Sequence, residues 1–213
     1  MRKREGDEIE LCDSSGRAFV ARLIESGECA KAILLEALPV CVKPELDVTL
    51  AQAVPKGAKM DFVVEKATEL GVARILPVVT ERTLVADARE GKLERWRRVA
   101  RAAAQQCGRA DVPAVEAPLA WEALCARFGE FGRTLVPWEL APDVPLRDAL
   151  PPLLAGVRSA LVAIGPEGGL SHAEVERASA AGASTISLGS RILRTETAGL
   201  VACSALLYQA GVL

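Results

Sequence analysis

Two glycine-rich segments near the carboxyl end of the chain have the pattern best suited to binding a small molecule. The first covers residues 164–169 (Ile-Gly-Pro-Glu-Gly-Gly), and the second covers residues 188–198 (Leu-Gly-Ser-Arg-Ile-Leu-Arg-Thr-Glu-Thr-Ala). Each follows a short apolar, strand-like run and leads into a helix-like pattern. Glycine lets a backbone approach a ligand closely, and ligands bind outside the carboxyl ends of strands in an open α/β sheet. The pair predicts a small-molecule site, although the first segment alone is also typical of an ordinary tight turn.

Three charged residues, Arg191, Arg194 and Glu196, stand where the second segment leads into an apolar helix pattern. Buried charges must be paired or functional, because leaving them alone in a low-dielectric interior is costly. One interpretation is an Arg–Glu ion pair that caps the helix. The other is that these side chains belong to an active site.

A basic stretch lies between residues 92 and 109, where six Lys or Arg residues face one acidic residue, Glu94. The formal net charge of the whole chain is -2, which excludes a globally basic nucleic-acid binder. Arginine suits phosphate recognition because its planar fork matches the geometry of phosphate oxygens. The stretch therefore indicates a local contact with a polyanion such as nucleic acid, the alternative being a solvated helix face.

The elements that would position these residues follow two patterns. Before residue 49, the runs 7–11, 18–24 and 30–37 read as strands of a small β domain. After it, strand-like and helix-like runs alternate, which predicts an α/β fold with a mostly parallel sheet and helices on both faces. We expect helices over 58–70, 92–107, 171–182 and from Thr195 onward, strands over 74–79, 112–116, 134–136, 159–164 and 185–188, and a loop over 142–154.

The chain has six cysteines without a C-x-x-C pair and a single histidine, so we expect no metal site and reduced thiols. The first ten residues are mostly charged and do not resemble a signal peptide, and no uncharged run is long and apolar enough to span a membrane. These features predict a cytoplasmic protein.

Several segments together resemble the RsmE family of ribosomal RNA methyltransferases, in the SPOUT superfamily. These segments span most of residues 50–210 and occur in the same order and with the same spacing as in the family. The matching segments are 59–62 (Lys-Met-Asp-Phe), 65–72 (Glu-Lys-Ala-Thr-Glu-Leu-Gly-Val), Pro77, Glu81-Arg82, Trp96, 105–109 (Gln-Gln-Cys-Gly-Arg), Val112-Pro113, 164–169, Leu188-Gly189 and 192–198.

The resemblance implies a PUA-like β-barrel domain over residues 1–49 and a SPOUT methyltransferase domain over 50–213 that ends in a deep trefoil knot. It implies S-adenosylmethionine (SAM) as cofactor, a homodimer, and methylation of N3 of a uridine in the decoding region of 16S ribosomal RNA in the small subunit. Family members usually begin further upstream, so we expect the barrel to lack its first strand and to leave an open sheet edge. Two alternatives are a SPOUT methyltransferase for another rRNA or tRNA site and a non-catalytic RNA-binding assembly protein.

The resemblance also implies roles for individual residues. Arg194 is expected to stabilise the negative charge that develops on the uracil carbonyl oxygens when N3 loses its proton. Glu196 is expected either to orient Arg194 or to accept that proton. The expected cofactor residues are Ile164, Gly165, Glu167, Gly168, Gly169, Leu188, Gly189, Ile192, Leu193 and Thr197. The expected RNA contacts are Arg98 and Arg101 of the basic stretch, together with Arg82, Gln105 and Arg109, for which the alternative is the dimer interface.

Overall fold

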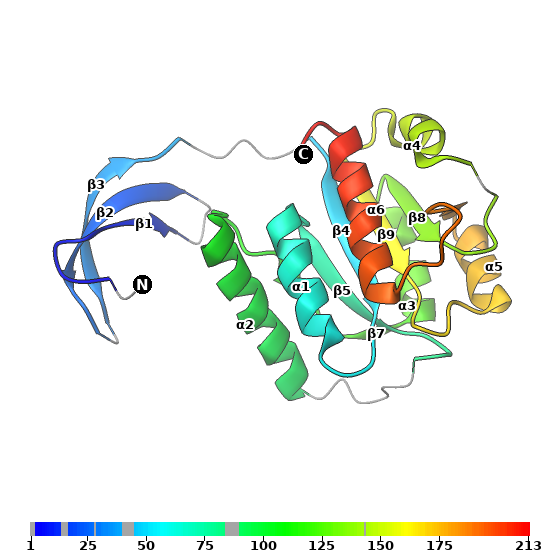
Figure 1. Ribbon diagram of the computed structural model, residues 1–213, viewed down its shortest axis with the longest axis horizontal. Helices are drawn as coiled ribbons and strands as arrows, with labels where there is room; N and C mark the ends of the chain where they lie inside the picture. The colour runs from blue at the N-terminus through cyan, green and yellow to red at the C-terminus, as the bar shows by residue number, and fades with distance from the viewer. Residues whose placement is uncertain (1–2, 14–16, 28, 40–44, 84–89, 143) are drawn as a thin grey trace. The chain divides into compact units, whose positions relative to one another are not determined.

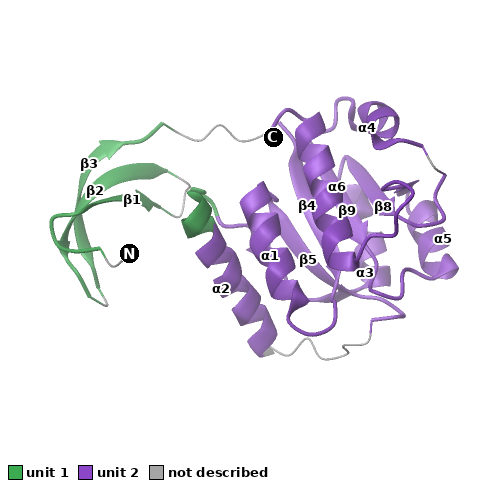
Figure 2. Cartoon of the chain, viewed as in Figure 1, with its two compact units in different colours: residues 1–43, 104–111 green, residues 44–103, 112–213 purple. Residues whose placement is uncertain are grey.

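The structure is a computed structural model that describes residues 3–13, 17–27, 29–39, 45–83, 90–142 and 144–213. The chain divides into two compact units, which Figure 2 shows in different colours. One unit holds residues 1–43 and 104–111, and the other holds residues 44–103 and 112–213. The predicted domain boundary between residues 49 and 50 falls inside a strand of the second unit.

The first unit contains a three-stranded antiparallel sheet in the order β1-β2-β3. Its strands are β1 (Glu8–Cys12), β2 (Ala18–Glu25) and β3 (Lys31–Ala37), which confirms the three strands predicted before residue 49. The middle strand pairs with both neighbours, so that Ala21 lies opposite Ile9 on one side and Leu34 on the other.

The second unit is built on a seven-stranded sheet in which every pairing is parallel. The strand order is β10-β8-β9-β4-β5-β6, with β7 also paired to β5. The strands are β4 (Asp47–Ala53), β5 (Arg74–Val79), β6 (Ala114–Val115), β7 (Leu119–Ala120), β8 (Arg133–Pro137), β9 (Ser159–Ile164) and β10 (Ser184–Ile186). The predicted parallel sheet is confirmed. Because parallel strands all end at the same edge, the loops after β4, β8 and β9 are neighbours there.

Helices cover both faces of this sheet, as predicted. They are α1 (Lys59–Leu70), α2 (Glu90–Cys107), α3 (Trp121–Ala126), α4 (Leu146–Leu154), α5 (His172–Ala180) and α6 (Thr195–Gln209), with a short 3-10 turn η1 (Phe128–Glu130) after α3. Strand side chains alternate between two cores: Leu50 packs with residues of α1, α2, α4 and α6, whereas Ala51 packs with residues of α3 and α5. Figure 1 shows α1 and α6 lying beside each other over one face.

Local end signals define several of these helices. Helix α1 ends at Gly71, whose φ of 99° is a left-handed conformation that glycine adopts without strain. Helix α5 begins with the predicted capping box, in which Ser171 and Glu174 each accept a hydrogen bond from the other's backbone N–H. Among the described residues, we find no helix whose length and apolar character would carry it across a bilayer.

The predicted loop over residues 142–154 is wrong, because residues 146–154 form α4. Pro151 and Pro152 lack backbone N–H groups and weaken this helix, which is why the sequence reads as a loop. Four leucines nevertheless recur at helical spacing and pack against the core on the α6 side of the sheet, so burial outweighs the poor local propensity. They are Leu146, Leu150, Leu153 and Leu154.

Candidate active site

The two glycine-rich segments lie against each other at the carboxyl edge of the parallel sheet. The hydroxyl of Thr195 donates a hydrogen bond of 2.6 Å to the backbone carbonyl of Gly165. The same hydroxyl accepts a hydrogen bond of 2.8 Å from the side-chain amide of Gln52. Gln52 lies near the end of β4, Gly165 directly follows β9, and Thr195 is the first residue of α6. A buried hydrogen-bond chain thus links three segments that are far apart in the sequence.

Helix α6 approaches the end of β4 closely because it carries a glycine at the contact. A Cβ atom on Gly199 would lie 2.8 Å from Oε1 of Gln52 and 3.3 Å from Leu50. Oε1 of Gln52 is buried and has no hydrogen-bond partner among the residues that the structure describes, whereas Nε2 of Gln52 donates to both Thr195 and the carbonyl of Ala53. Any larger residue at position 199 would therefore push α6 away from this hydrogen-bond chain.

Lys59, at the start of α1, connects the two segments a second time. Its Nζ lies 3.2 Å from a carboxylate oxygen of Glu196 and 3.7 Å from one of Glu167. The Glu196 side chain is only 13% exposed, so this pairing compensates a largely buried charge. The structure thus corrects one of the two interpretations of the charged cluster: among the described residues, Glu196 pairs with Lys59 and not with an arginine.

Glu167 is held by backbone as well as by charge. Its carboxylate accepts a hydrogen bond of 3.0 Å from the backbone N–H of Lys56, in the loop between β4 and α1. Burial alone would raise the pKa of Glu167, but the backbone N–H groups and the nearby charges of Lys59 and Lys56 outweigh it and lower the pKa below its usual value. Glu167 is consequently an ionised anchor for the first glycine-rich segment.

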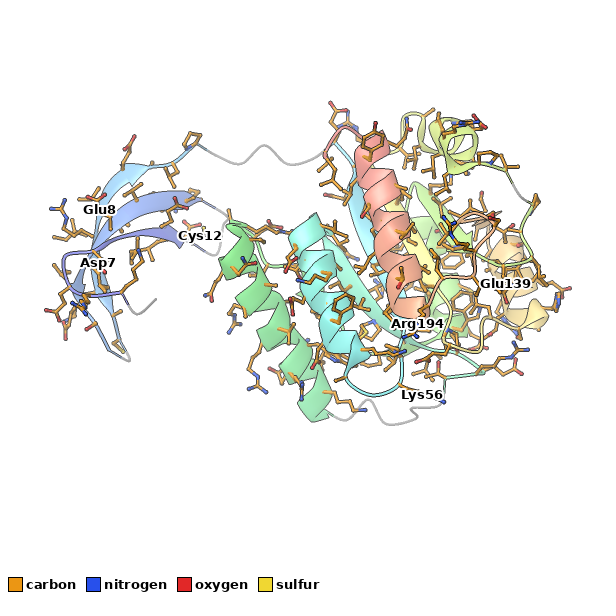
Figure 3. All side chains as sticks on the ribbon, in the orientation of Figure 1. Asp7, Glu8, Cys12, Lys56, Glu139 and Arg194 are labelled. Atoms are coloured by element: carbon orange, nitrogen blue, oxygen red, sulfur yellow. The ribbon has the colours of Figure 1, made fainter. Side chains whose placement is uncertain are left out.

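The outer side of the first segment contacts two further charged residues. Arg82, which follows β5, donates a hydrogen bond of 2.8 Å to the carbonyl of Gly168. Glu139, which follows β8, lies so close that a Cβ on Gly169 would be 2.9 Å from its Oε1. Figure 3 shows Glu139 and Arg194 among the side chains of this unit, with Lys56 in the loop before α1. The glycine at 169 has a φ of 69°, so both its conformation and its surroundings exclude a larger residue.

Buried Glu174 fixes the loop that carries Arg82. One of its carboxylate oxygens accepts from the backbone N–H of Glu81 at 2.8 Å, and the other accepts from the backbone N–H of Ser171 at 2.9 Å. The indole N–H of Trp121 donates to the Glu174 carbonyl at 3.0 Å. This arrangement ties the end of β5 to the start of α5.

Several of the remaining predicted cofactor and catalytic residues in the second glycine-rich segment are exposed, whereas Ile164 of the first segment is buried. Arg194 is exposed at the N-cap of α6 and makes no capping hydrogen bond with its side chain. Gly189 has a φ of 101° with no atom near its missing Cβ, and Ile192 is 89% exposed. Thr197 is exposed, whereas Leu188 packs against the core.

The predicted RNA contacts are divided between the two compact units. Arg98 and Arg101 are exposed on α2 within the second unit, and Arg82 contacts the glycine-rich turn. Gln105 and Arg109 belong to residues 104–111 of the other unit, where Arg109 pairs with Asp111 at 2.8 Å.

Sequence reasoning assigned no individual role to Gln52, Lys59 or Glu139. The available signals were a polar residue ending an apolar strand, a lysine beginning an amphipathic helix, and an acidic residue directly after a strand.

Residues 42–207, which include the parallel sheet and both glycine-rich segments, match the RNA methyltransferase domain family. The ribosomal RNA small subunit methyltransferase E of Bacillus subtilis is 35% identical, over 98% of this chain and 84% of that protein. The protein of the same name from Mycobacterium bovis is 33% identical, over 96% of this chain and 79% of that protein.

Two solved structures extend this similarity. The crystal structure of a ribosomal RNA small subunit methyltransferase E from Neisseria gonorrhoeae bound to SAM has a TM-score of 0.86 and 32% identity, over 96% of this chain and 84% of that chain. A methyltransferase of Legionella pneumophila in complex with SAM has a TM-score of 0.83 and 30% identity, over 97% of this chain and 84% of that chain. The chain belongs to the RsmE family of ribosomal RNA small subunit methyltransferases.

Proposed function

We propose that this protein transfers a methyl group from SAM to N3 of a uridine in the decoding region of 16S ribosomal RNA in the small ribosomal subunit. Membership of the RsmE family supports the reaction class, and two homologues with bound SAM support the cofactor. The observation that carries the proposal is the Gln52–Thr195–Gly165 hydrogen-bond chain, which holds the two glycine-rich segments together at the edge where ligands bind.

The residues at this edge fit the chemistry of SAM. The backbone at Gly189 has no atom within 4 Å of its missing Cβ, and such an uncovered backbone suits an adenosine, since glycine permits close approach. We assign the cofactor site to Ile164, Gly165, Glu167, Gly168, Gly169, Leu188, Gly189, Ile192, Leu193 and Thr197. When bound there, SAM supplies a methyl group on a sulfonium, and the chain supplies position and electrostatics.

Arg194 is the proposed electrostatic residue of the reaction. Its side chain is exposed next to the second glycine-rich segment and makes no capping contact that its loss would break. Uridine N3 must lose a proton before it can attack, and the resulting charge spreads over the ring oxygens. A guanidinium stabilises that charge without changing its own protonation.

Glu196 has two proposed roles, which an experiment can separate. Its carboxylate is ion-paired with Lys59 and stands two residues after Arg194, and the two proposed roles are to accept the N3 proton or to orient Arg194. If Glu196 is the base, Glu196→Gln should be inactive at every pH, because an amide cannot accept the proton. If Glu196 only orients Arg194, Glu196→Gln should keep part of its activity, because the amide still has a hydrogen-bond acceptor.

The substrate contacts are proposed from charge and exposure. Arg82, Arg98, Arg101, Gln105 and Arg109 are assigned to the RNA, and residues 1–49 are assigned to a PUA-like domain that assists in RNA binding. The implied trefoil knot in the 50–213 domain agrees with the contact between the two glycine-rich segments. The site of action of such an enzyme is the cytoplasm.

We also propose a homodimer. Helix α6 is apolar along its length, yet Val201 is 38% exposed and Tyr208 is 73% exposed, and Phe62 of α1 is 47% exposed. Apolar side chains on two adjacent helices are typical of a surface covered by a partner. Light scattering coupled to size exclusion should give twice the mass of one chain.

Purified protein should methylate small ribosomal subunits with SAM, and rRNA from a deletion strain should lack one N3-methyluridine by mass spectrometry. Methylation of tRNA instead of the ribosomal subunit would favour a different SPOUT substrate, and absence of SAM binding by calorimetry would favour a non-catalytic protein. Arg194→Ala should lower kcat by about 10²–10³-fold, with the fold retained. The control Arg191→Ala removes another exposed guanidinium of the same segment and should retain activity.

A further inference from the structure

A cavity lies away from the glycine-rich segments, between α2 and the segment that contains β6. It has a volume of about 270 Å³ and is lined by Arg97 and Arg101 of α2 and by residues 112–115. All of these residues belong to one compact unit. We call this cavity the α2 groove. Sites for whole drug-sized ligands usually begin at about 300 Å³, so the groove suits a smaller group.

Arg97 forms a fixed wall of the α2 groove. Its Nε donates a hydrogen bond of 3.2 Å to the carbonyl of Val115, and its Nη1 donates one of 2.7 Å to Glu94. The first contact attaches the 112–115 segment to the helix, and the second neutralises the charge of Arg97. Arg97 therefore holds the groove open and has little free charge to offer a ligand.

Arg101 is the free cation of the groove. It lies one helical turn after Arg97, on the same side of α2, and is exposed. Within the described parts of the chain it has no hydrogen bond or ion pair. Glu94, an acid of the same helix, pairs with Arg97 instead. An uncompensated guanidinium at the rim of a cavity attracts an anion.

The opposite wall is apolar. Val112 is 49% exposed, and the next residue, Pro113, is buried. A guanidinium on one side and an exposed apolar surface on the other match a nucleotide, whose phosphate is charged and whose sugar and base have apolar faces.

We infer that the α2 groove binds one nucleotide of the ribosomal RNA outside the target uridine, with its phosphate on Arg101 and its sugar or base against Val112. This inference rests on the proposed function, because it takes the polyanion to be the RNA substrate. The groove is a binding site separate from the cofactor edge, so its loss weakens substrate binding without changing the chemical step.

The test uses two variants of the full-length protein and two matched controls. Arg101→Ala removes the free cation, and Val112→Asp places a negative charge on the apolar wall. Arg147→Ala and Val144→Asp make the same changes on exposed residues of the α4 region, where the Arg147 side chain is 84% exposed. The measured quantities are KM for small ribosomal subunits, kcat, SAM affinity, and the salt dependence of RNA binding.

Arg101→Ala is expected to raise KM by about tenfold, from the loss of one charge-assisted contact, and to reduce the slope of log K against log salt by about 1. Val112→Asp should raise KM comparably, while kcat, SAM affinity and both controls remain at wild-type values. A wild-type KM and a wild-type salt slope in both groove variants would overturn the inference. It would also be overturned if these variants bound RNA normally but bound an acidic polyglutamate peptide more weakly, because the groove would then serve an acidic protein. If the wild-type protein methylates no ribosomal subunit, the proposed function fails, and RNA binding by the same four variants still tests the groove.

Discussion

The most informative perturbation of this protein is Thr195→Val, because one hydroxyl group joins the two glycine-rich segments. Valine has nearly the shape of threonine but can neither donate to the Gly165 carbonyl nor accept from Gln52. The substitution therefore removes two hydrogen bonds while leaving the packing nearly unchanged.

The cost follows from burial. Thr195 is 5% exposed and Gln52 is fully buried, so water cannot replace the lost partners. The Gly165 carbonyl and one N–H of the Gln52 amide become unsatisfied, at about 1–3 kcal/mol for each buried group. We expect the free energy of unfolding to fall by about 2–4 kcal/mol, which for a protein of this size lowers the melting temperature by roughly 5–15 °C.

The assay is urea unfolding followed by tryptophan fluorescence. All three tryptophans lie in the unit that contains Thr195, so the signal reports that unit alone. Thr195→Ser keeps the hydroxyl and should recover most of the loss, whereas Thr197→Val makes the same change at an exposed position of the same helix and should leave stability within about 0.5 kcal/mol of wild type. SAM affinity should weaken in Thr195→Val more than in Thr195→Ser. A wild-type unfolding midpoint for Thr195→Val would refute the view that this hydroxyl holds the site together.

Three further outcomes follow from the same contacts. Gly199→Ala should destabilise the protein by about 1–3 kcal/mol through overpacking, while Gly91→Ala, which has no atom within 4 Å of the new Cβ, should be neutral or slightly stabilising in thermal unfolding. The pKa of Glu167 is lowered in the folded state, so its ionised carboxylate stabilises the folded protein at pH values above its unfolded pKa. This stabilisation is lost as the pH falls through the folded pKa. Between about pH 5 and pH 3, the free energy of unfolding in urea titrations should therefore fall more for wild type than for Glu167→Gln. Burial raises the pKa of the Cys203 thiol to about 12, so iodoacetamide at pH 8 should leave Cys203 unmodified in the native protein while it alkylates the exposed Cys107, as read by mass spectrometry.

Sequence patterns predicted the elements whose periodicity agreed with their end signals. The apolar spacing of residues 58–70 followed by Gly71 gave α1, and the Ser171–Glu174 capping box gave the start of α5. The pattern failed where burial overruled propensity, as in the proline-containing α4, and where an element was too short to show a period, as in the six-residue α3.

The site was only partly predictable for a different reason. The glycine-rich segments are local signals, since a strand, a tight turn and a helix are contiguous in the sequence. The contacts that join them are not local: Gln52 and Thr195 are 143 positions apart, and Lys59 and Glu196 are 137 positions apart. No spacing rule within a single chain segment relates such residues. The ion-pair partner of Glu196 could therefore be identified only from the fold, in which α1 lies beside α6.

The buried Gln52 amide shows how strongly this junction is specified. The hydroxyl of Thr195 has one proton, and it is used on the Gly165 carbonyl at 2.6 Å. Thr195 must therefore accept from Gln52, which requires the amide nitrogen to face the hydroxyl and turns Oε1 toward Gly199. The reverse orientation would set two acceptors against each other and leave the amide nitrogen without its two partners. Within the described residues, two buried side-chain polar atoms lack a partner, Oε1 of Gln52 and Oγ1 of Thr134. For Gln52, that orientation satisfies three other polar groups and keeps α6 close to the edge where the cofactor is proposed to bind.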